Sequence, residues 1–340
     1  MDSSFLLRDY RVVCFSGASM KLAFSVILFF VTYPMVAIAE EAACPQLEGN
    51  LQPGGLLWGT VAPTTAIVFE GIDVPTLPDG SFVLGLGRDA PSSVTLTVSV
   101  ETDGVSISCD LDIAKREYRI SRVEGVPQST VTPPEEQLER IRKERQLVRA
   151  AKAQVIENQT FLRAVQAGLA WPAEGRISGV YGSQRFYNGK PGNPHYGVDI
   201  ARPTGTPVLA PGPGVVTLAE PDLFYSGGTV ILDHGYGLSS SFLHMSRVDV
   251  SVGDELRTGD PLGAIGATGR ATGPHLDWRM YWADQRIDPA LLALQHDDPS
   301  PHLIVASLIM TFVSAKPILL SSTMILLRFF HTLCYKRLAV

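Results

Sequence analysis

The sequence predicts a mainly β protein with a small N-terminal β-sandwich, a long linker helix and a Gly-rich C-terminal antiparallel β domain. Three observations lead to this fold class. The 340 residues include 31 Gly and 24 Pro, which favours short strands joined by turns. Short runs of alternating apolar residues occur on both sides of one long stretch that has neither Gly nor Pro. The length by itself suggests about two domains.

The overall charge excludes one class of partner. The chain has 28 Lys and Arg against 34 Asp and Glu, so its formal net charge is −6. A nucleic-acid-binding protein would normally carry a basic surplus, so none is expected here. Charged residues make up 18% of the chain, below the roughly 25% of an ordinary soluble domain, while 45% is hydrophobic. The apolar excess lies mainly at the two ends of the chain.

The N-terminal end resembles a cleavable export signal. Leu22–Ala39 has no charged residue, follows a lysine and ends in the small-residue sequence Ala37-Ile38-Ala39. This pattern predicts that the region 1–39 is a secretory signal peptide whose natural start is Met20. The preceding residues are then an over-long translation start or an extended basic region. The alternative is an uncleaved anchor, although the run is slightly short of the ~20 residues that a spanning helix needs.

The C-terminal end is also apolar. Residues 303–330 form a tail interrupted by Lys316 and Pro317. A lysine in mid-membrane costs about 2.5–3.5 kcal/mol on insertion scales, which the many Leu and Ile could offset. If the tail spans a membrane, the basic residues after it place the C-terminus in the cytoplasm and the preceding domains outside. The alternative is a non-native tail, for example from a shifted reading frame. Both interpretations stay open.

Residues 45–125 are expected to form the N-terminal β domain. Turn-rich spacing separates its alternating runs, as in a small antiparallel sandwich. The predicted strands are Thr65–Phe69, Ser81–Leu86, Val94–Val100, Val105–Ile113 and Tyr118–Val123. Cys44 and Cys109 lie in the exported part, where a disulfide could form, although the sequence does not fix their pairing. No ligand cluster occurs in this region, so we expect a structural or partner-binding role.

Residues 134–168 are predicted to form the linker helix. Glu135–Ala167 has no Gly or Pro and carries acids in its first turn, where the helix dipole favours them. A continuous helix of this length would extend about 50 Å. Its apolar residues recur every seventh position in one narrow stripe, at Ile141, Val148, Val155 and Leu162. The pattern predicts a solvated helix that packs one edge on a domain.

Residues 171–295 are expected to form the second domain. It holds 19 of the 31 Gly and short β runs at Gly214–Leu218, Thr229–Leu232 and Ser240–Leu243. Four of the seven His also fall here, and two of them come with nearby acids: His195 with Asp199 as H-x-x-x-D, and His275 with Asp277 as H-x-D.

The H-x-D motif places both polar side chains on one side of a strand. Positions i and i+2 share a face, so His275 and Asp277 would point into a cleft while Leu276 points into the core. A mixed set of His and carboxylate ligands suits a catalytic zinc ion with three protein ligands and one open position. The two motifs together therefore predict a metal site.

At these residues the sequence resembles a known family, the lysostaphin-like (LytM-type) zinc metallopeptidases, which cut peptide bonds in bacterial peptidoglycan. The resemblance runs from about Gly179 to Pro289. It rests on motifs in family order: GVYGSQR, HYGVDIA, GTPVLAPGPGVV, GGTVILDHGYGLSSSFLHMS, VGDELRTGDPLGAIGATG and TGPHLDW. The preceding sandwich and helix resemble the N-terminal region of exported Gram-negative members.

The resemblance implies a role for each motif residue and one Zn²⁺ per chain. His195 and Asp199 match the first two zinc ligands of the family. His244 matches the His that lies beside the metal and helps to stabilise the transition state. His275 matches the first His of the family's H-x-H, which acts in proton transfer. The second His of that motif, a zinc ligand, is replaced here by Asp277.

The change to Asp277 alters the expected electrostatics. Asp can bind zinc through oxygen at about 2.0–2.2 Å, so the site need not be inactive. Two carboxylates and a neutral His around a divalent ion sum to zero, whereas one carboxylate and two His leave +1. A less positive centre should acidify water less and bind harder metals such as manganese more readily. In the alternative interpretation, Asp277 orients His275 and His275 itself binds the metal.

Other motifs have weaker implications. His234 matches a family position that is not a principal ligand, and we expect it to hydrogen-bond a loop. The GATGRATG loop lacks G-K-[ST] and a following helix, so it predicts no nucleotide site. Tyr181, Arg185 and Asn188 precede the metal motif and could line a substrate groove.

The resemblance implies a periplasmic, metal-dependent endopeptidase that hydrolyses peptide cross-links of peptidoglycan. The expected partners are peptidoglycan peptide stems, and contact with a membrane is expected only through the C-terminal tail or an anchor. The alternative is an inactive member that binds the wall or activates other wall hydrolases, and the Asp277 departure is the reason to consider it. The sequence does not predict the oligomeric state.

Overall fold

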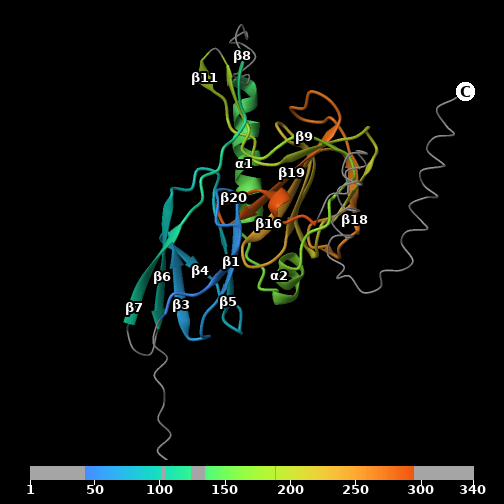
Figure 1. Cartoon of the computed structure of the whole chain (residues 1–340). Helices are drawn as coiled ribbons and strands as arrows, with labels where there is room; N and C mark the ends of the chain where they lie inside the picture. Colours follow the sequence, from blue (N-terminus) through green and yellow to red (C-terminus); the bar gives the residue numbers. More distant parts are fainter. Residues whose placement is uncertain (1–42, 101–104, 124–134, 188, 295–340) are drawn as a thin grey trace, which may run out of the picture. The chain divides into compact units, whose positions relative to one another are not determined.

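A computed structural model describes residues 43–100, 105–123, 135–187 and 189–294 (Figure 1). The predicted signal region 1–39 and the apolar tail 303–330 therefore lie outside the described residues. Within the described part of the chain, no helix is long and apolar enough to cross a membrane. The described residues are mainly β, as the sequence predicts.

The N-terminal β domain consists of two antiparallel sheets, with the strand orders β1-β2-β5 and β4-β3-β6-β7. Their bounds are β1 Leu47–Gly49, β2 Leu56–Thr60, β3 Thr65–Phe69, β4 Ile72–Val74, β5 Ser81–Gly85, β6 Ser93–Val100 and β7 Val105–Asp112. Alternate residues such as Ile67, Phe69, Leu96 and Val98 are buried, which is the period-2 pattern of strands with one core-facing side. The first four predicted strands are thus present within a residue or so of their expected bounds.

Cys44 and Cys109 form a disulfide whose Cα atoms are 5.7 Å apart. Cys109 lies in β7 and is buried, whereas Cys44 precedes β1. The bond therefore joins the start of the domain to its last antiparallel strand and closes a loop with a sequence separation of 65. This is the pairing that the sequence allowed but did not fix.

The last strand expected in the sandwich has a different partner. β8 (Ile120–Val123) pairs in parallel with β10 (Gln184–Tyr187), which also pairs with β11 (Lys190–Pro191). The segment before β8 contacts the second domain, because the Arg116 guanidinium donates to the Asp288 carboxylate at 2.5 Å. The strand therefore belongs to a three-stranded sheet with β10 and β11 of the second domain and not to the sandwich.

The prediction of a single helix is wrong, because the described residues of this region, 135–168, form two helices (Figure 1). A 3₁₀ turn, η2 (Glu135–Gln137), leads into α1 (Leu138–Lys152), and α2 (Gln159–Gln166) follows a break. The Asn158 side chain accepts the backbone N–H groups of Thr160 and Phe161 at 3.0 and 3.2 Å, which starts a new helix. In the break, the carbonyl of Ile156 accepts the Tyr236 N–H at 2.9 Å, a bond that a continuous helix would not offer.

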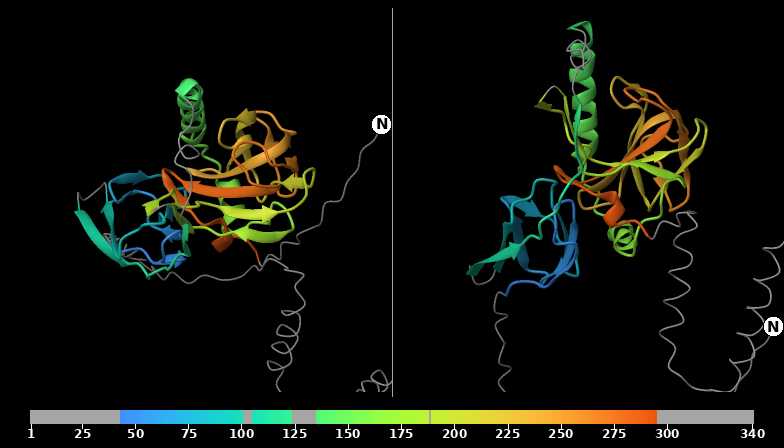
Figure 2. Two further views of the ribbon diagram at one scale, coloured as in Figure 1. Left: turned by 90° about the horizontal axis from the view of Figure 1, so that it is seen from above. Right: turned by 45° about the horizontal axis from the view of Figure 1, so that its top comes forward.

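The second domain is built on one large sheet with the order β17-β14-β15-β16-β19-β12-β9, to which β13, β18 and β20 attach. Figure 2 shows the yellow-to-orange strands of this domain gathered together. The bounds are β9 Arg176–Gly179, β12 Val198–Ala201, β13 Pro207–Leu209, β14 Gly214–Leu223, β15 Gly227–Asp233, β16 Leu238–Val248, β17 Glu255–Leu256, β18 Pro261–Ile265, β19 His275–Trp282, β20 Gln285–Ile287 and the 3₁₀ turn η3 Pro289–Leu291. The strands predicted from the short β runs correspond to β14, β15 and β16.

Helix α1 packs on one face of this sheet. Ala151 of α1 lies in a small apolar cluster with Leu218 and Leu223 of β14 and Ile231 of β15. Glu144 of α1 also accepts the backbone N–H of Phe224 at 2.8 Å. Ile141 is buried and Val148 is half-buried, as the predicted apolar stripe requires, but Val155 lies beyond the end of α1 and is exposed.

Candidate metal centre

Two neighbouring antiparallel strands bring two carboxylates face to face. In the pairing of β12 with β19, Asp199 lies directly opposite Asp277, and Ala201 lies opposite His275. Like charges at directly opposed cross-strand positions repel and destabilise a sheet. The register therefore creates a place where a cation would be stabilised.

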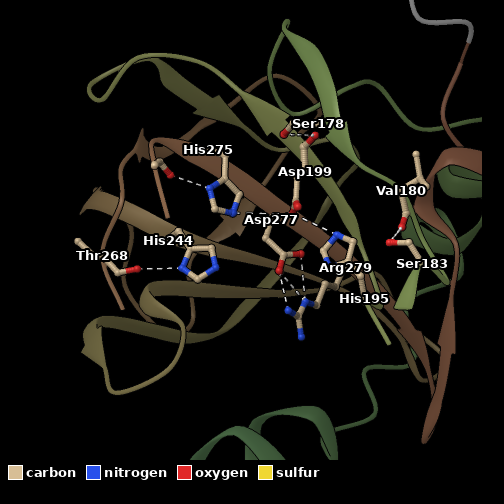
Figure 3. A network of polar contacts seen from close by, with 11 residues as sticks. Ser178, Val180, Ser183, His195, Asp199, His244, Thr268, His275, Asp277 and Arg279 are labelled. Atoms are coloured by element: carbon tan, nitrogen blue, oxygen red, sulfur yellow. Dashed lines mark hydrogen bonds and ion pairs between the residues drawn. The ribbon is translucent and has the colours of Figure 1, made fainter. Parts of the chain in front are cut away.

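His195 completes a cluster of three potential ligands (Figure 3). It lies in the loop before β12, and ligand atoms of His195, Asp199 and Asp277 all lie within 4.8 Å of one another. His195 Nε2 is 3.1 Å from Asp199 Oδ1. Both atoms are buried, and apart from this contact with each other neither has a hydrogen-bond partner among the described residues. Buried polar atoms are rarely left unpaired, so this pair of atoms fits a bound metal ion.

Two glycines leave room for the carboxylates. A Cβ atom at Gly179 would approach Asp199 Oδ2 to 2.1 Å, and one at Gly197 would approach Asp277 Oδ1 to 2.5 Å. Both distances are well inside van der Waals contact, so any larger residue would displace a carboxylate. Neither glycine could be singled out from the sequence, because the role of each depends on a carboxylate that packs against it from a neighbouring strand.

Asp277 is also held by a residue that sequence reasoning missed, Arg279 (Figure 3). Asp277 is 2% exposed. Arg279 Nε lies 3.0 Å from both carboxylate oxygens, and a terminal guanidinium nitrogen lies 2.6 Å from Oδ2. Burial alone would raise the pKa of Asp277, but the Arg279 charge and hydrogen bonds outweigh it and lower the pKa. The i, i+2 spacing after Asp277 was the available sequence signal.

The electrostatics around His195 favour a positive charge at this place. Burial opposes protonation of His195, but the hydrogen-bonding and charge effects of Asp199 and Asp277 raise its pKa above the ordinary value. In a site without a metal ion, a proton on His195 partly offsets the two carboxylates. A divalent cation would compete with that proton, which makes metal binding at this site weaker at low pH.

His275 lies at the start of β19 beside the cluster. Its Nδ1 is 2.8 Å from the Gly273 carbonyl oxygen, and its Nε2 is 3.9 Å from Asp199 Oδ1. A carbonyl can only accept, so Nδ1 carries the proton and Nε2 of the neutral ring has a free lone pair. The geometry groups Asp277, rather than His275, with His195 and Asp199.

His244 lies in β16 with an uncommon backbone conformation. Its φ angle is +64°, in the left-handed region that non-glycine residues rarely adopt. Its Nδ1 is 2.8 Å from the Thr268 carbonyl oxygen, and its ring centroid is 4.8 Å from that of His275. Burial lowers its pKa, which disfavours the cationic form of the ring. Strain of this kind is often retained where a side chain must be aimed at a site.

The remaining sequence candidates lie elsewhere. The expected hydrogen bond from His234 to a loop is present, since its Nδ1 is 2.7 Å from the Pro213 carbonyl oxygen and its Nε2 is 2.8 Å from Ser240 Oγ. Tyr181 is buried and donates to the Arg286 carbonyl at 2.6 Å, so the suggestion that it lines a groove is wrong. Arg185 is exposed on β10, and Asn188 lies outside the described residues.

A cavity of about 750 Å³ lies between α1 and the sheet. Arg279 and Tyr281 of β19, Ser241 of β16 and Lys152 of α1 are among its lining residues. Arg279 therefore contacts Asp277 and also lines this cavity. Helix α1 therefore lies across this cavity from Arg279 and Tyr281, which are on the same side of β19 as Asp277.

Comparisons with known proteins agree with this geometry. Residues 193–289 match peptidase family M23. The peptidoglycan DD-endopeptidase ShyA of Vibrio cholerae is 40% identical over 87 residues, which are 26% of this chain and 20% of ShyA. The DD-carboxypeptidase/endopeptidase Mpg of Neisseria gonorrhoeae is 37% identical over 112 residues, which are 33% of this chain and 25% of Mpg. The chain thus spans a quarter or less of the length of these two curated relatives.

A solved structure extends the similarity beyond the matched family region. A crystal structure from Pseudomonas aeruginosa assigned to peptidase M23 has a TM-score of 0.55 and 29% sequence identity. The similarity covers 72% of this chain and 95% of that chain. Residues 193–289 alone are less than a third of the 340 residues, so the shared fold includes elements outside this region.

Proposed function

Because residues 193–289 form a peptidase family M23 domain, we propose that this chain is a zinc-dependent endopeptidase that hydrolyses peptide cross-links of bacterial peptidoglycan. The observation that carries the proposal is the convergence of His195, Asp199 and Asp277, in which the buried His195 Nε2 and Asp199 Oδ1 have no polar partner but each other within hydrogen-bond distance among the described residues. ShyA, which is named as a peptidoglycan DD-endopeptidase, supports the substrate class, and Mpg, which is named as a DD-carboxypeptidase/endopeptidase, supports the reaction class. A wall substrate in turn favours an exported, periplasmic location.

The three clustered residues would hold the metal ion. One His nitrogen and two carboxylate oxygens are ligands that zinc accepts, and three protein ligands leave a position open for catalysis. When bound, the ion polarises a substrate carbonyl and lowers the pKa of a water molecule. Asp199 and Asp277 also fix the position of the site, because they come from adjacent paired strands.

His275 is the proposed general base and acid. Its Nδ1–H group donates to the Gly273 carbonyl, which orients the ring and leaves Nε2 free on the side of Asp199. Nε2 can take a proton from the attacking water and return it to the leaving amine. A positioned His typically contributes 10²–10⁴-fold to such proton transfers.

His244 is the proposed donor to the oxyanion. Its Nδ1–H group is already committed to the Thr268 carbonyl, so only the cationic ring can donate from Nε2. Burial lowers the pKa of the free ring, but an oxyanion that develops beside Nε2 stabilises the cation. The donated bond would therefore be stronger in the transition state than with bound substrate, which is the condition for catalysis.

The alternative is an inactive member that binds the wall or activates other hydrolases. The Asp277 departure favours it, whereas the presence of His195, Asp199, His244 and His275 favours an enzyme. A domain that had lost catalysis would be under no requirement to keep a strained His244 beside His275. We therefore propose the enzyme in preference to the binding protein.

The deciding experiment measures metal content and turnover together. The full chain is purified, its zinc content is measured, and it is incubated with cross-linked peptidoglycan whose fragments are separated by mass. We expect about one zinc per chain and release of un-cross-linked fragments, both lost with chelator and restored by zinc. His275→Ala should keep the zinc and lose the fragments.

Two outcomes would contradict the proposal in different ways. A chain that binds neither zinc nor peptidoglycan has neither function. A chain that binds peptidoglycan without releasing fragments, and that behaves like His275→Ala, would instead be the wall-binding protein.

A further inference from the structure

We infer that Asp277 and Arg279 act as a single, electrically neutral unit at the third ligand position, in which Arg279 compensates the charge that Asp277 adds to the metal site. The inference rests on the proposed function, since it assumes the metal centre described above. It assigns a role to Arg279, which no motif of the sequence singled out.

The contacts show that Arg279 holds both oxygens of the carboxylate. Its Nε lies 3.0 Å from each oxygen, while a terminal nitrogen lies 2.6 Å from Oδ2. The side chain of Arg279 is 27% exposed, against 3% for Asp277, so the carboxylate has little access to solvent. Because a carboxylate can accept about four hydrogen bonds, lone pairs remain for a metal ion beside the Arg279 contacts.

The two oxygens are not equivalent. Oδ2 accepts the shorter bond and two of the three contacts, so Oδ1 is the less occupied oxygen. Gly197 follows closely after His195 in the chain, and its missing Cβ leaves space next to Oδ1. The Asp277 carboxylate is thus held on the Oδ2 side by the Arg279 guanidinium, and its Oδ1 is left open near the loop that carries His195.

The charge balance follows directly. A divalent ion with Asp199, Asp277 and a neutral His195 sums to zero, but the Arg279 cation brings the sum to +1. This equals the sum for one carboxylate and two neutral His. Arg279 therefore removes the electrostatic penalty expected from the sequence for replacing His by Asp, while keeping an oxygen ligand. Arginine suits this role because it stays charged and binds carboxylates with a planar fork.

The test measures zinc affinity of the full chain by competition with a chromophoric chelator, in a set of variants with different net charge. Arg279→Gln lowers the site charge by one, and Asp277→His raises it by one. The double variant restores the charge of the parent. The readout is a dissociation constant and does not depend on turnover.

The inference predicts an order of affinities. Arg279→Gln should bind zinc at least about tenfold more tightly than the parent, because a cation next to the ion is removed. Asp277→His should bind at least about tenfold more weakly, because it leaves the Arg279 cation uncompensated beside the ion. The double variant should return to within about threefold of the parent. Arg279→Lys, which keeps the charge, should also remain within about threefold.

A matched control is available at the exposed end of β16. Arg247 and Asp249 form a similar two-bond pair at 2.6 and 2.9 Å, also two residues apart. Arg247→Gln removes the same type of charge and should leave zinc affinity unchanged. Thermal unfolding of each variant checks its folding, and Asp277→Asn makes the same charge change if Asp277→His does not fold.

Specific results would overturn the inference. If Arg279→Gln matches the parent, or binds more weakly, Arg279 does not act through its charge on the metal. A parent that binds zinc and cleaves peptidoglycan while the affinities stay flat would overturn this inference alone. A parent that binds no zinc would overturn the metal-dependent proposal together with it.

Discussion

The two β regions of the molecule are built from similar antiparallel strands but bury different side chains. In residues 43–123, Thr65 is the one buried polar or charged residue found among the described positions. The described residues of the second domain bury ten, including Asp233, His234, His244 and Asp277. Buried polar groups cost free energy unless they are paired. The second domain thus contains buried polar groups that the described residues of the first domain largely lack, and two of them, His244 and Asp277, belong to the candidate site.

One strand shows how the difference arises. In β19, Leu276, Trp278, Met280 and Trp282 are almost fully buried and form the core side. The other side carries His275, Asp277, Arg279 and Tyr281. In the N-terminal domain, the two-residue period places alternate side chains in the core and in solvent. In β19, it places them in the core and on the side of the candidate site. We therefore expect substitutions on the polar side of β19 to change the rate of hydrolysis, and substitutions in the N-terminal domain to change stability.

The largest effect is expected at the polar side of β19. His275→Ala should lower peptidoglycan hydrolysis by about 10²–10⁴-fold, because a positioned proton acceptor is removed. Its unfolding free energy should change little, since among the described residues the ring makes one hydrogen bond, to the Gly273 carbonyl. The rate is measured from released fragments at fixed enzyme concentration. His234→Ala is the control: it should lower stability, because Pro213 and Ser240 lose their partner, but leave the rate per folded molecule unchanged.

In the N-terminal domain the expected effect is on stability alone. Cys44→Ser with Cys109→Ser opens a loop with a sequence separation of 65. The chain-entropy relation gives a loss of about 4 kcal/mol in unfolding free energy. Denaturant unfolding measures it, and the reduced parent should behave like the variant. A large loss of hydrolysis in the folded variant would contradict the separation between the two regions.

A pH-dependent effect distinguishes buried from exposed acids. Burial raises the pKa of Asp233 to about 6. Between about pH 4 and 6 the folded chain holds a proton that the unfolded chain releases, so the unfolding free energy falls as pH rises. The loss approaches about 3 kcal/mol above pH 6, and Asp233→Asn should remove this dependence. Chemical unfolding at several pH values measures it.

Asp79 in the N-terminal domain supplies the opposite sign. The Ser81 backbone N–H donates to its carboxylate, and Arg163 pairs with it, so its pKa is lowered. Stability from Asp79 is therefore present above the unfolded pKa and is lost as pH falls. If Asp79→Asn and Asp233→Asn showed pH dependences of the same sign, the contrast in burial would not explain them.

The smallest effect is expected at the helix break. Asn158→Ala removes the side chain that accepts the Thr160 and Phe161 N–H groups, and it should cost about 1 kcal/mol. Asn158→Asp, which can still cap the helix, is the matched control. Thermal unfolding should show a small decrease for the first variant and none for the second.

Much of this architecture could be predicted from the sequence because it depends on local periodicity. Alternation identified β3 and β6, and the H-x-D spacing placed His275 and Asp277 on one face of β19. The helix break was missed because an Asn at position 158 is, by its residue type alone, also compatible with a continuous helix. It is the bond from Tyr236 to Ile156, a contact across the sequence, that stabilises the break. The same reason explains β8, whose partner β10 is some sixty residues further along the chain.

The sequence alone determined the fold class, the resemblance to lysostaphin-like peptidases and the residue types of the candidate metal site. These follow from periodicity and from motif spacing. The tertiary structure decided how those residues meet: Asp199 opposite Asp277, His195 beside them, and the guanidinium of Arg279 on the carboxylate that replaces a histidine. Charge at a site is a sum over neighbours in space, and neighbours in space depend on strand register, which the sequence motifs do not state.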